Sequence, residues 1–165
     1  MDLAIPTKLD NKLVGELDRL VSEGFYVSRS EAIREAVRRL VAEHYISLQR
    51  FIRVIAEIAS EILKSNLASV ITDVVLFGSV ARGDATLESD IDLLILIEHE
   101  DASRVRRKSH KIIYPISLVS ATPITLIIMN REEFIEWIKD ELNFAREIKE
   151  EGIQLYGDVL SLVRN

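Results

Sequence analysis

The sequence predicts an α+β protein in which a small helical unit precedes a small sheet with flanking helices. Two observations carry this prediction. Residues 29–67 contain neither glycine nor proline and repeat apolar side chains at helical spacing. Beyond them, short apolar runs alternate with amphipathic stretches, which is typical of strands and helices that share one core. We therefore expect one domain at residues 1–45 and a second at residues 46–165.

The first 45 residues have the pattern of one strand and two helices. Apolar residues alternate from Leu3 to Leu9, which predicts a short strand. The next apolar residues repeat at helical spacing, and Gly24 marks the end of that helix. Ser28 or Ser30 then caps a second helix. Such a unit is too small to bury a core alone and leaves a strand edge without a partner, so we expect a homodimer whose strands pair.

The second helix either runs on into the next unit or breaks near residues 44–46. Beyond it, strands are expected at 74–77, 93–97, 124–129 and 152–157, and helices at 104–120 and 132–149. Pro115 should kink or end the first of these helices. The same helix is rich in basic residues, which indicates either a solvated face or a surface for an acidic partner or nucleic acid.

The segment from Gly78 to Ile95, GSVARGDATLESDIDLLI, holds the candidate functional residues. Asp90 and Asp92 flank one residue at the start of a strand, so their side chains share a face, with Cα atoms roughly 7 Å apart. Paired carboxylates are ligands for hard divalent cations. Gly78 allows a backbone to approach closely, and Ser79 offers donors to a phosphate. Together these residues indicate a site for a metal–triphosphate.

These residues resemble the nucleotidyltransferases of the DNA polymerase beta superfamily, above all the minimal nucleotidyltransferases, over roughly residues 46–158. The resemblance implies a small mixed sheet with flanking helices. It also implies adenylyl transfer from ATP with Mg²⁺ held by Asp90 and Asp92, which are the catalytic and metal-binding candidates. It also implies nucleotide contacts, for which the candidates are Gly78, Ser79, Arg82, Gly83 and Ser89. Arg82 either neutralises the leaving pyrophosphate or stiffens the loop through a salt bridge.

One position departs from the family pattern. Members usually add a third carboxylate from the strand expected at 124–129, where this chain has Thr125 and no acid on that strand. The third carboxylate helps to hold the metal that activates the attacking hydroxyl. The resemblance therefore implies that nucleotide still binds but that transfer is weakened. Asp84 and Glu88 are the acids nearby in sequence that could replace it.

The run GFYVSRSEAIREAVRRL, from Gly24 to Leu40, resembles the turn and second helix of CopG-like ribbon-helix-helix repressors. The resemblance implies a paired ribbon in the DNA major groove and a phosphate clamp at the start of the second helix. Only Lys8 among the outward ribbon positions is a good donor to base edges. The alternative interpretation, a dimerisation module that no longer binds DNA, is therefore retained. The DNA-binding candidates are Ala4, Pro6, Lys8, Ser28, Arg29 and Ser30.

Three functions follow from the two resemblances. The first is an adenylyltransferase for a protein partner, since minimal nucleotidyltransferases pair as antitoxins with helical HEPN toxins, and a ribbon-helix-helix domain suits an antitoxin that represses its own operon. The second is a catalytically weak or inactive regulator. The third is an adenylyltransferase for a small molecule, against which the lack of a second substrate domain counts.

Composition excludes several classes. The 165 residues include no cysteine, which excludes a disulfide framework and a thiolate metal site. The formal net charge of −6 disfavours indiscriminate nucleic-acid binding. No apolar signal region begins the sequence, and no run reaches the roughly 18 apolar residues of a membrane span. We expect a cytoplasmic protein.

Overall fold

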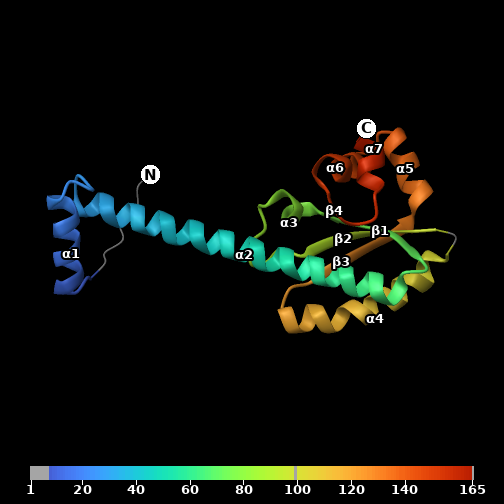
Figure 1. Cartoon of the computed structure of the whole chain (residues 1–165), viewed down its shortest axis with the longest axis horizontal. Coiled ribbons are helices and arrows are strands. Elements are labelled where there is room, and N and C mark those ends of the chain that lie inside the picture. The colour runs from blue at the N-terminus through green and yellow to red at the C-terminus, as the bar shows by residue number, and fades with distance from the viewer. Residues whose placement is uncertain (1–7, 99, 165) are drawn as a thin grey trace. The chain divides into compact units, whose positions relative to one another are not determined.

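A computed structural model describes residues 8–98 and 100–164, and Figure 1 shows its elements. The chain divides into two compact units, residues 1–45 and 46–165. Among the described residues, no helix is both long enough and apolar enough to cross a membrane.

The first unit contains α1 (Asn11–Ser22) and the start of α2 (Arg29–Leu67). Gly24, with φ +82°, follows α1 as its sequence position predicts. Ser28 Oγ accepts the Glu31 N–H at 3.2 Å, while Glu31 Oε2 accepts the Val27 N–H at 2.7 Å. This reciprocal pair makes Ser28, rather than Ser30, the residue that caps α2.

The predicted strand from Leu3 to Leu9 lies outside the described residues, apart from Lys8 and Leu9, which are in irregular structure. The sequence left open whether the second helix runs on or breaks near residues 44–46. Helix α2 is one helix of 39 residues and has no break there. No glycine or proline interrupts it. Ion pairs at helical spacing, such as Arg39 with Glu35 and Arg53 with Glu57, both at 3.1 Å, add local support.

The second unit is built on a four-stranded sheet with the order β3-β2-β1-β4. Strand β1 pairs antiparallel with both β2 and β4, and β2 pairs parallel with β3. The sheet is therefore mixed, as predicted, and the α+β fold class is confirmed. The strands are β1 (Ile71–Phe77), β2 (Ile91–Ile97), β3 (Ile124–Asn130) and β4 (Ile153–Tyr156).

Helices cover both faces of this sheet, as Figure 1 shows. Alternate residues of β2 point to opposite cores. Leu93 and Ile95 pack with α2 and α4 (Ala102–Ser120), whereas Leu94 and Leu96 pack on the side of the C-terminal helices. These helices are α5 (Arg131–Lys139), α6 (Asn143–Glu151) and α7 (Val159–Arg164).

One helix prediction was wrong, and at Pro115 one of two expected alternatives is excluded. The segment 132–149 forms two helices, because the chain turns between them and Glu141 takes a left-handed φ of +54°. Helix α4 continues through Pro115, which was expected to kink or end it. Pro115 lies on the exposed side of α4, so the carbonyl group that lacks its proline partner is not shut into the core. Helix α7 was not predicted.

A buried carboxylate joins the end of the sheet to the C-terminal segment. Asp73 on β1 is fully buried and accepts the backbone N–H groups of Asp158 and Val159, each at 2.8 Å. Its other oxygen pairs with Arg131 Nε at 2.9 Å. A Cβ at Gly157 would overlap the Asp73 carboxylate, and the φ of this glycine is +82°. The network thus fixes β1, α5 and the turn before α7 to one another.

Candidate functional site

The candidate residues meet where β1 ends and β2 begins. Because the two strands are antiparallel, these ends lie at one edge of the sheet, and Phe77 is the Cα partner of Asp92. Gly78 follows with φ +71°, and a Cβ there would overlap Asp92 Oδ2. Glycine is required at this position both by the backbone conformation and by the carboxylate above it.

The Ala-Arg-Gly turn expected from the sequence belongs to a short helix, α3 (Gly78–Arg82). Gly83 ends this helix in the left-handed region, with φ +80°. Ser79 is half-buried beside Gly78, and its carbonyl group accepts the Asp84 N–H at 3.0 Å. The backbone of Gly78, Ser79 and Gly83 thus lines one side of the site edge.

Three hydrogen bonds support the loop between α3 and β2, which contains Asp90. Ser89 Oγ accepts the Thr86 N–H at 2.8 Å, so the observed contact of Ser89 is with the loop itself. Gln49 on α2 donates from Nε2 to the Ala85 carbonyl oxygen at 2.7 Å, and Ala85 is buried in the core. At the end of the loop, the Ile91 N–H bonds to the Pro123 carbonyl oxygen at 2.9 Å.

Asp92 lies on the face of β2 that carries Leu94 and Leu96, and Asp90 lies two positions earlier, one residue before the strand begins. Among the described residues, no hydrogen bond or salt bridge joins either carboxylate to another side chain. Burial raises the pKa of Asp92, the charge of Asp90 raises it further, and Arg82 opposes both. Two adjacent carboxylates without partners, one of them half-buried, are a donor set that fits a hard divalent cation.

Arg82 pairs with two acids. Its Nε lies 3.2 Å from Asp84 Oδ2, and its Nη1 lies 3.4 Å from Glu151 Oε2 at the end of α6. Of the two roles that the sequence left open, this geometry supports the salt bridge that stiffens the loop. The same salt bridge occupies the carboxylate of Asp84, which the sequence analysis named with Glu88 as a possible replacement for the third carboxylate.

Thr125 is the Cα partner of Asp92 in the parallel pairing of β2 with β3. Its side chain therefore shares the face of Asp90 and Asp92, at the place where a third carboxylate would complete the set. Glu88 lies exposed in the loop. Throughout the described ranges, no three His, Cys, Asp or Glu side chains are grouped so that they could hold a metal ion.

The site is bordered by an aromatic cluster, which the sequence analysis did not predict. Phe77 contacts Phe144 edge-to-face with ring centroids 5.6 Å apart, and Phe144 contacts Trp137 at 6.4 Å. All three rings are partly buried against the core on this side of the sheet. The sequence shows Phe77 as the last apolar residue before Gly78. Its ring partners Trp137 and Phe144 lie on α5 and α6, and no spacing rule connects these helices to β1.

The DNA-binding candidates of the first unit are only partly described. Ala4 and Pro6 lie outside the described residues. The Arg29 guanidinium is bidentate on Asp18, with Nη2 2.5 Å from Oδ2, and this hydrogen bond lowers the pKa of Asp18. Ser28 caps α2, so two of the three expected phosphate-clamp residues already have partners within the chain.

Comparison with known proteins defines the class of protein. The sequence profile of the nucleotidyltransferase domain family matches residues 55–155, and the chain belongs to this family. A second profile, for ribbon-helix-helix proteins of the copG family, matches residues 8–44. The chain is therefore a nucleotidyltransferase-family protein with an N-terminal ribbon-helix-helix domain.

Several individual proteins share the second unit. Two provisionally named protein adenylyltransferases of Methanocaldococcus jannaschii are 34% and 38% identical over 98 and 97 residues. Each match covers 57% of this chain, and they cover 98% and 87% of those proteins. Spectinomycin 9-adenylyltransferase of Staphylococcus aureus is 30% identical over 82 residues, 47% of this chain, but the chain spans only 32% of that enzyme. A solved toxin–antitoxin structure with AMP-PNP has a TM-score of 0.46 and 17% identity, covering 65% of this chain and 79% of that one.

We expect Asp92→Asn to stabilise the chain at pH 7 in the absence of divalent cations. Because the pKa of Asp92 is raised in the folded state, the folded chain still holds this proton at pH values where the unfolded chain has released it. Ionisation of Asp92 therefore lowers stability as the pH rises above about 3.9, the ordinary pKa of aspartate. The Asn side chain cannot ionise, so the variant avoids this loss of stability. Its gain in the free energy of unfolding over wild type should therefore shrink as the pH falls toward about 3.9. Urea unfolding from pH 3 to pH 7 measures it.

The matched control is Asp140→Asn, at an exposed position after α5, which should change stability little at any pH. A gain from Asp92→Asn that is equally large at pH 3, or no gain at pH 7, would contradict the assignment.

Proposed function

We propose that the chain binds Mg–ATP at Asp90 and Asp92 and transfers the adenylyl group to a protein partner. The observation that carries this proposal is the pair of carboxylates at the start of β2, which no side chain among the described residues engages, with Gly78 close against Asp92. Membership of the nucleotidyltransferase family implies nucleotide use. The names of the two M. jannaschii relatives favour ATP as donor and a protein as acceptor.

In this proposal the acceptor hydroxyl attacks the α-phosphate and pyrophosphate leaves. Asp90 and Asp92 hold the cation, which supplies the positive charge that offsets the growing charge on the phosphates. The backbone at Gly78, Ser79 and Gly83 approaches the β- and γ-phosphates. Arg82 stays paired with Asp84 and Glu151 and keeps this backbone in position. Ser89 holds the loop that presents Asp90.

A second candidate is a catalytically weak or inactive regulator that uses the same fold to bind nucleotide or a partner. One observation favours it: Thr125 stands beside Asp92 where a third carboxylate would lie. Transfer to a small molecule draws support from the spectinomycin enzyme, but the chain spans about a third of that protein.

The ribbon-helix-helix domain supports a regulatory setting for either candidate. We place the chain in the cytoplasm as an antitoxin-like protein that pairs with a helical HEPN-type toxin, forms a homodimer and represses its own operon through operator DNA. Proteins of the copG class pair their ribbons and read the major groove.

Replacing both Asp90 and Asp92 with Asn should abolish Mg²⁺-dependent ATP binding, because it removes both anionic ligands of the site. Titration calorimetry with Mg–ATP measures the loss. Quenching of Trp137, the single tryptophan of the chain, gives a second signal because its ring belongs to the cluster beside the site. The double variant Glu132→Gln and Glu133→Gln, on α5, is the matched control and should bind normally. Equal Mg–ATP affinity in wild type and in the Asn variant would reject the site.

Thr125→Asp should raise the rate of adenylyl transfer, because a carboxylate beside Asp92 completes the second metal position. The assay follows release of pyrophosphate, and labelling of a HEPN-type partner, with Thr125→Asn as the isosteric control. A gain of about tenfold or more for Asp alone supports an incomplete active site. Strong wild-type transfer that neither substitution changes would show that another residue supplies the function.

The full chain should sediment as a dimer at micromolar concentration. Leu40 and Val37 of α2 are 67% and 53% exposed in the single chain, and an apolar helix face of this kind is buried when ribbon-helix-helix units pair. Leu40→Asp should shift the equilibrium toward monomer by at least about tenfold. Leu162→Asp on α7 is the control, and a wild-type monomer would contradict the pairing.

A further inference from the structure

One exposed face of α4 changes chemistry halfway along its length. Its first half carries basic side chains and its second half carries apolar ones, at spacings of three or four residues that keep them on one side of the helix. We call this face the α4 surface. Its residues are Arg104, Lys108, Lys111, Pro115, Leu118 and Val119.

The apolar half borders a groove of about 510 Å³ between α4 and α2. Phe51, Ile55 and Ile58 line it from α2, opposite Pro115 and Val119. Val119 is 88% exposed, Phe51 54% and Ile58 47%, so the groove is open and its apolar walls face solvent. An apolar concavity of this size with exposed walls marks a surface that binds another molecule.

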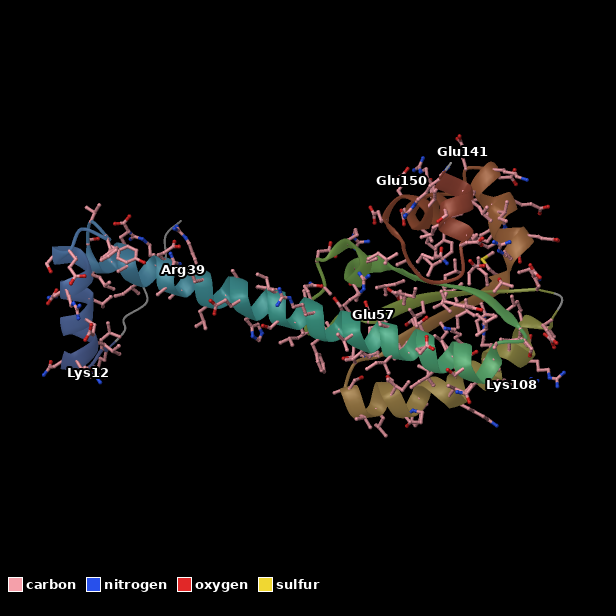
Figure 2. All side chains as sticks on the ribbon, viewed as in Figure 1. Lys12, Arg39, Glu57, Lys108, Glu141 and Glu150 are labelled. Atoms are coloured by element: carbon pink, nitrogen blue, oxygen red, sulfur yellow. The ribbon has the colours of Figure 1, made fainter. Side chains whose placement is uncertain are left out.

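The basic half lacks partners within the chain. Among the described residues, no salt bridge or side-chain hydrogen bond engages Arg104, Lys108 or Lys111. Some basic residues on the neighbouring helix are paired instead: Arg53 and Lys64 of α2 each contact a glutamate on the same helix. In a chain of net charge −6, the first half of α4 is therefore a local concentration of uncompensated positive charge. Figure 2 shows Lys108 on α4 and Glu57 on α2.

The basic half and the apolar half of the α4 surface together limit which class of partner can bind there. A second copy of the chain would set the basic half against either another basic half or an apolar one, because a two-fold contact pairs identical surfaces. A nucleic acid would satisfy the basic half but offers no apolar surface to the aliphatic groove. A helix with acidic side chains at one end and apolar side chains at the other matches both halves.

We propose that the α4 surface is the docking site for an amphipathic helix of a protein partner, with acidic residues against Arg104, Lys108 and Lys111 and apolar residues in the groove at Val119. Helices α2 and α4 cover the face of the sheet opposite to the one that carries Asp92. A partner docked there leaves the nucleotide site open. The surface is therefore independent of the proposed transfer reaction and can be tested separately from it.

The test uses the full chain and two fluorescein-labelled synthetic helices of about 20 residues, about 30 Å long, each with Glu in one half and Leu in the other half of a single face. The two helices carry the acidic half at opposite ends, so both orientations are covered. Fluorescence anisotropy should show micromolar binding of one of them. Lys108→Glu and Val119→Asp should each weaken it at least about tenfold. A helix with Lys in place of Glu should not bind.

Matched controls are Lys139→Glu on α5 and Leu162→Asp on α7, both exposed and both expected to leave affinity unchanged. Absence of binding by both helices, or binding that neither Lys108→Glu nor Val119→Asp weakens, would overturn the proposal. So would tighter binding of a DNA or RNA oligonucleotide that is lost in Lys108→Glu. Because the chain has no cysteine, a disulfide dimer formed by Val119→Cys but not by Leu162→Cys would assign the groove to a second copy instead.

Discussion

The antiparallel pairing of β1 with β2 is the constraint on which the rest of the site depends. Its register opposes Phe77 to Asp92, and the chain must then leave β1 through a residue that tolerates both a positive φ and a carboxylate at contact distance. Only glycine meets both conditions at position 78. A shift of this register by one residue would turn Asp90 and Asp92 to the opposite face and separate them from Gly78.

Two anchors hold this register in place. At the far end of β1, the buried Asp73 binds the backbone before α7 and the Arg131 guanidinium, so the C-terminal segment cannot move independently of the sheet. At the site, Gln49 of α2 holds the loop carbonyl group at Ala85. Between these anchors Asp92 is partly buried beside Asp90, and burial, followed by the charge of Asp90, raises the pKa of Asp92.

The two faces of the sheet suit different tasks. The face under α5 and α6 carries the carboxylates, Thr125 and the aromatic cluster, which is the chemistry expected for nucleotide binding. The face under α2 and α4 ends in an open groove beside a basic stripe. In the proposals above, a partner on α2 and α4 would therefore leave the proposed nucleotide site uncovered, since the four strands stand between the two surfaces.

The sequence by itself determined the α+β class, because strands and helices have different apolar periods. The mixed sheet was implied by the resemblance to nucleotidyltransferases, and the expectation that Asp90 and Asp92 share a face comes from the two-residue period of a strand. It also predicted Gly24 as the end of α1, since a left-handed position favours glycine. Only the tertiary structure decided that Arg82 is held by Glu151 and that Phe144 and Trp137 border the site, and it pairs Thr125 with Asp92 as the resemblance implied. These pairs join residues far apart in the chain, and no local period encodes such neighbours. The turn at Glu141 and the continuation of α4 through Pro115 also depart from local propensity, which is a weak guide that the folded context overrides.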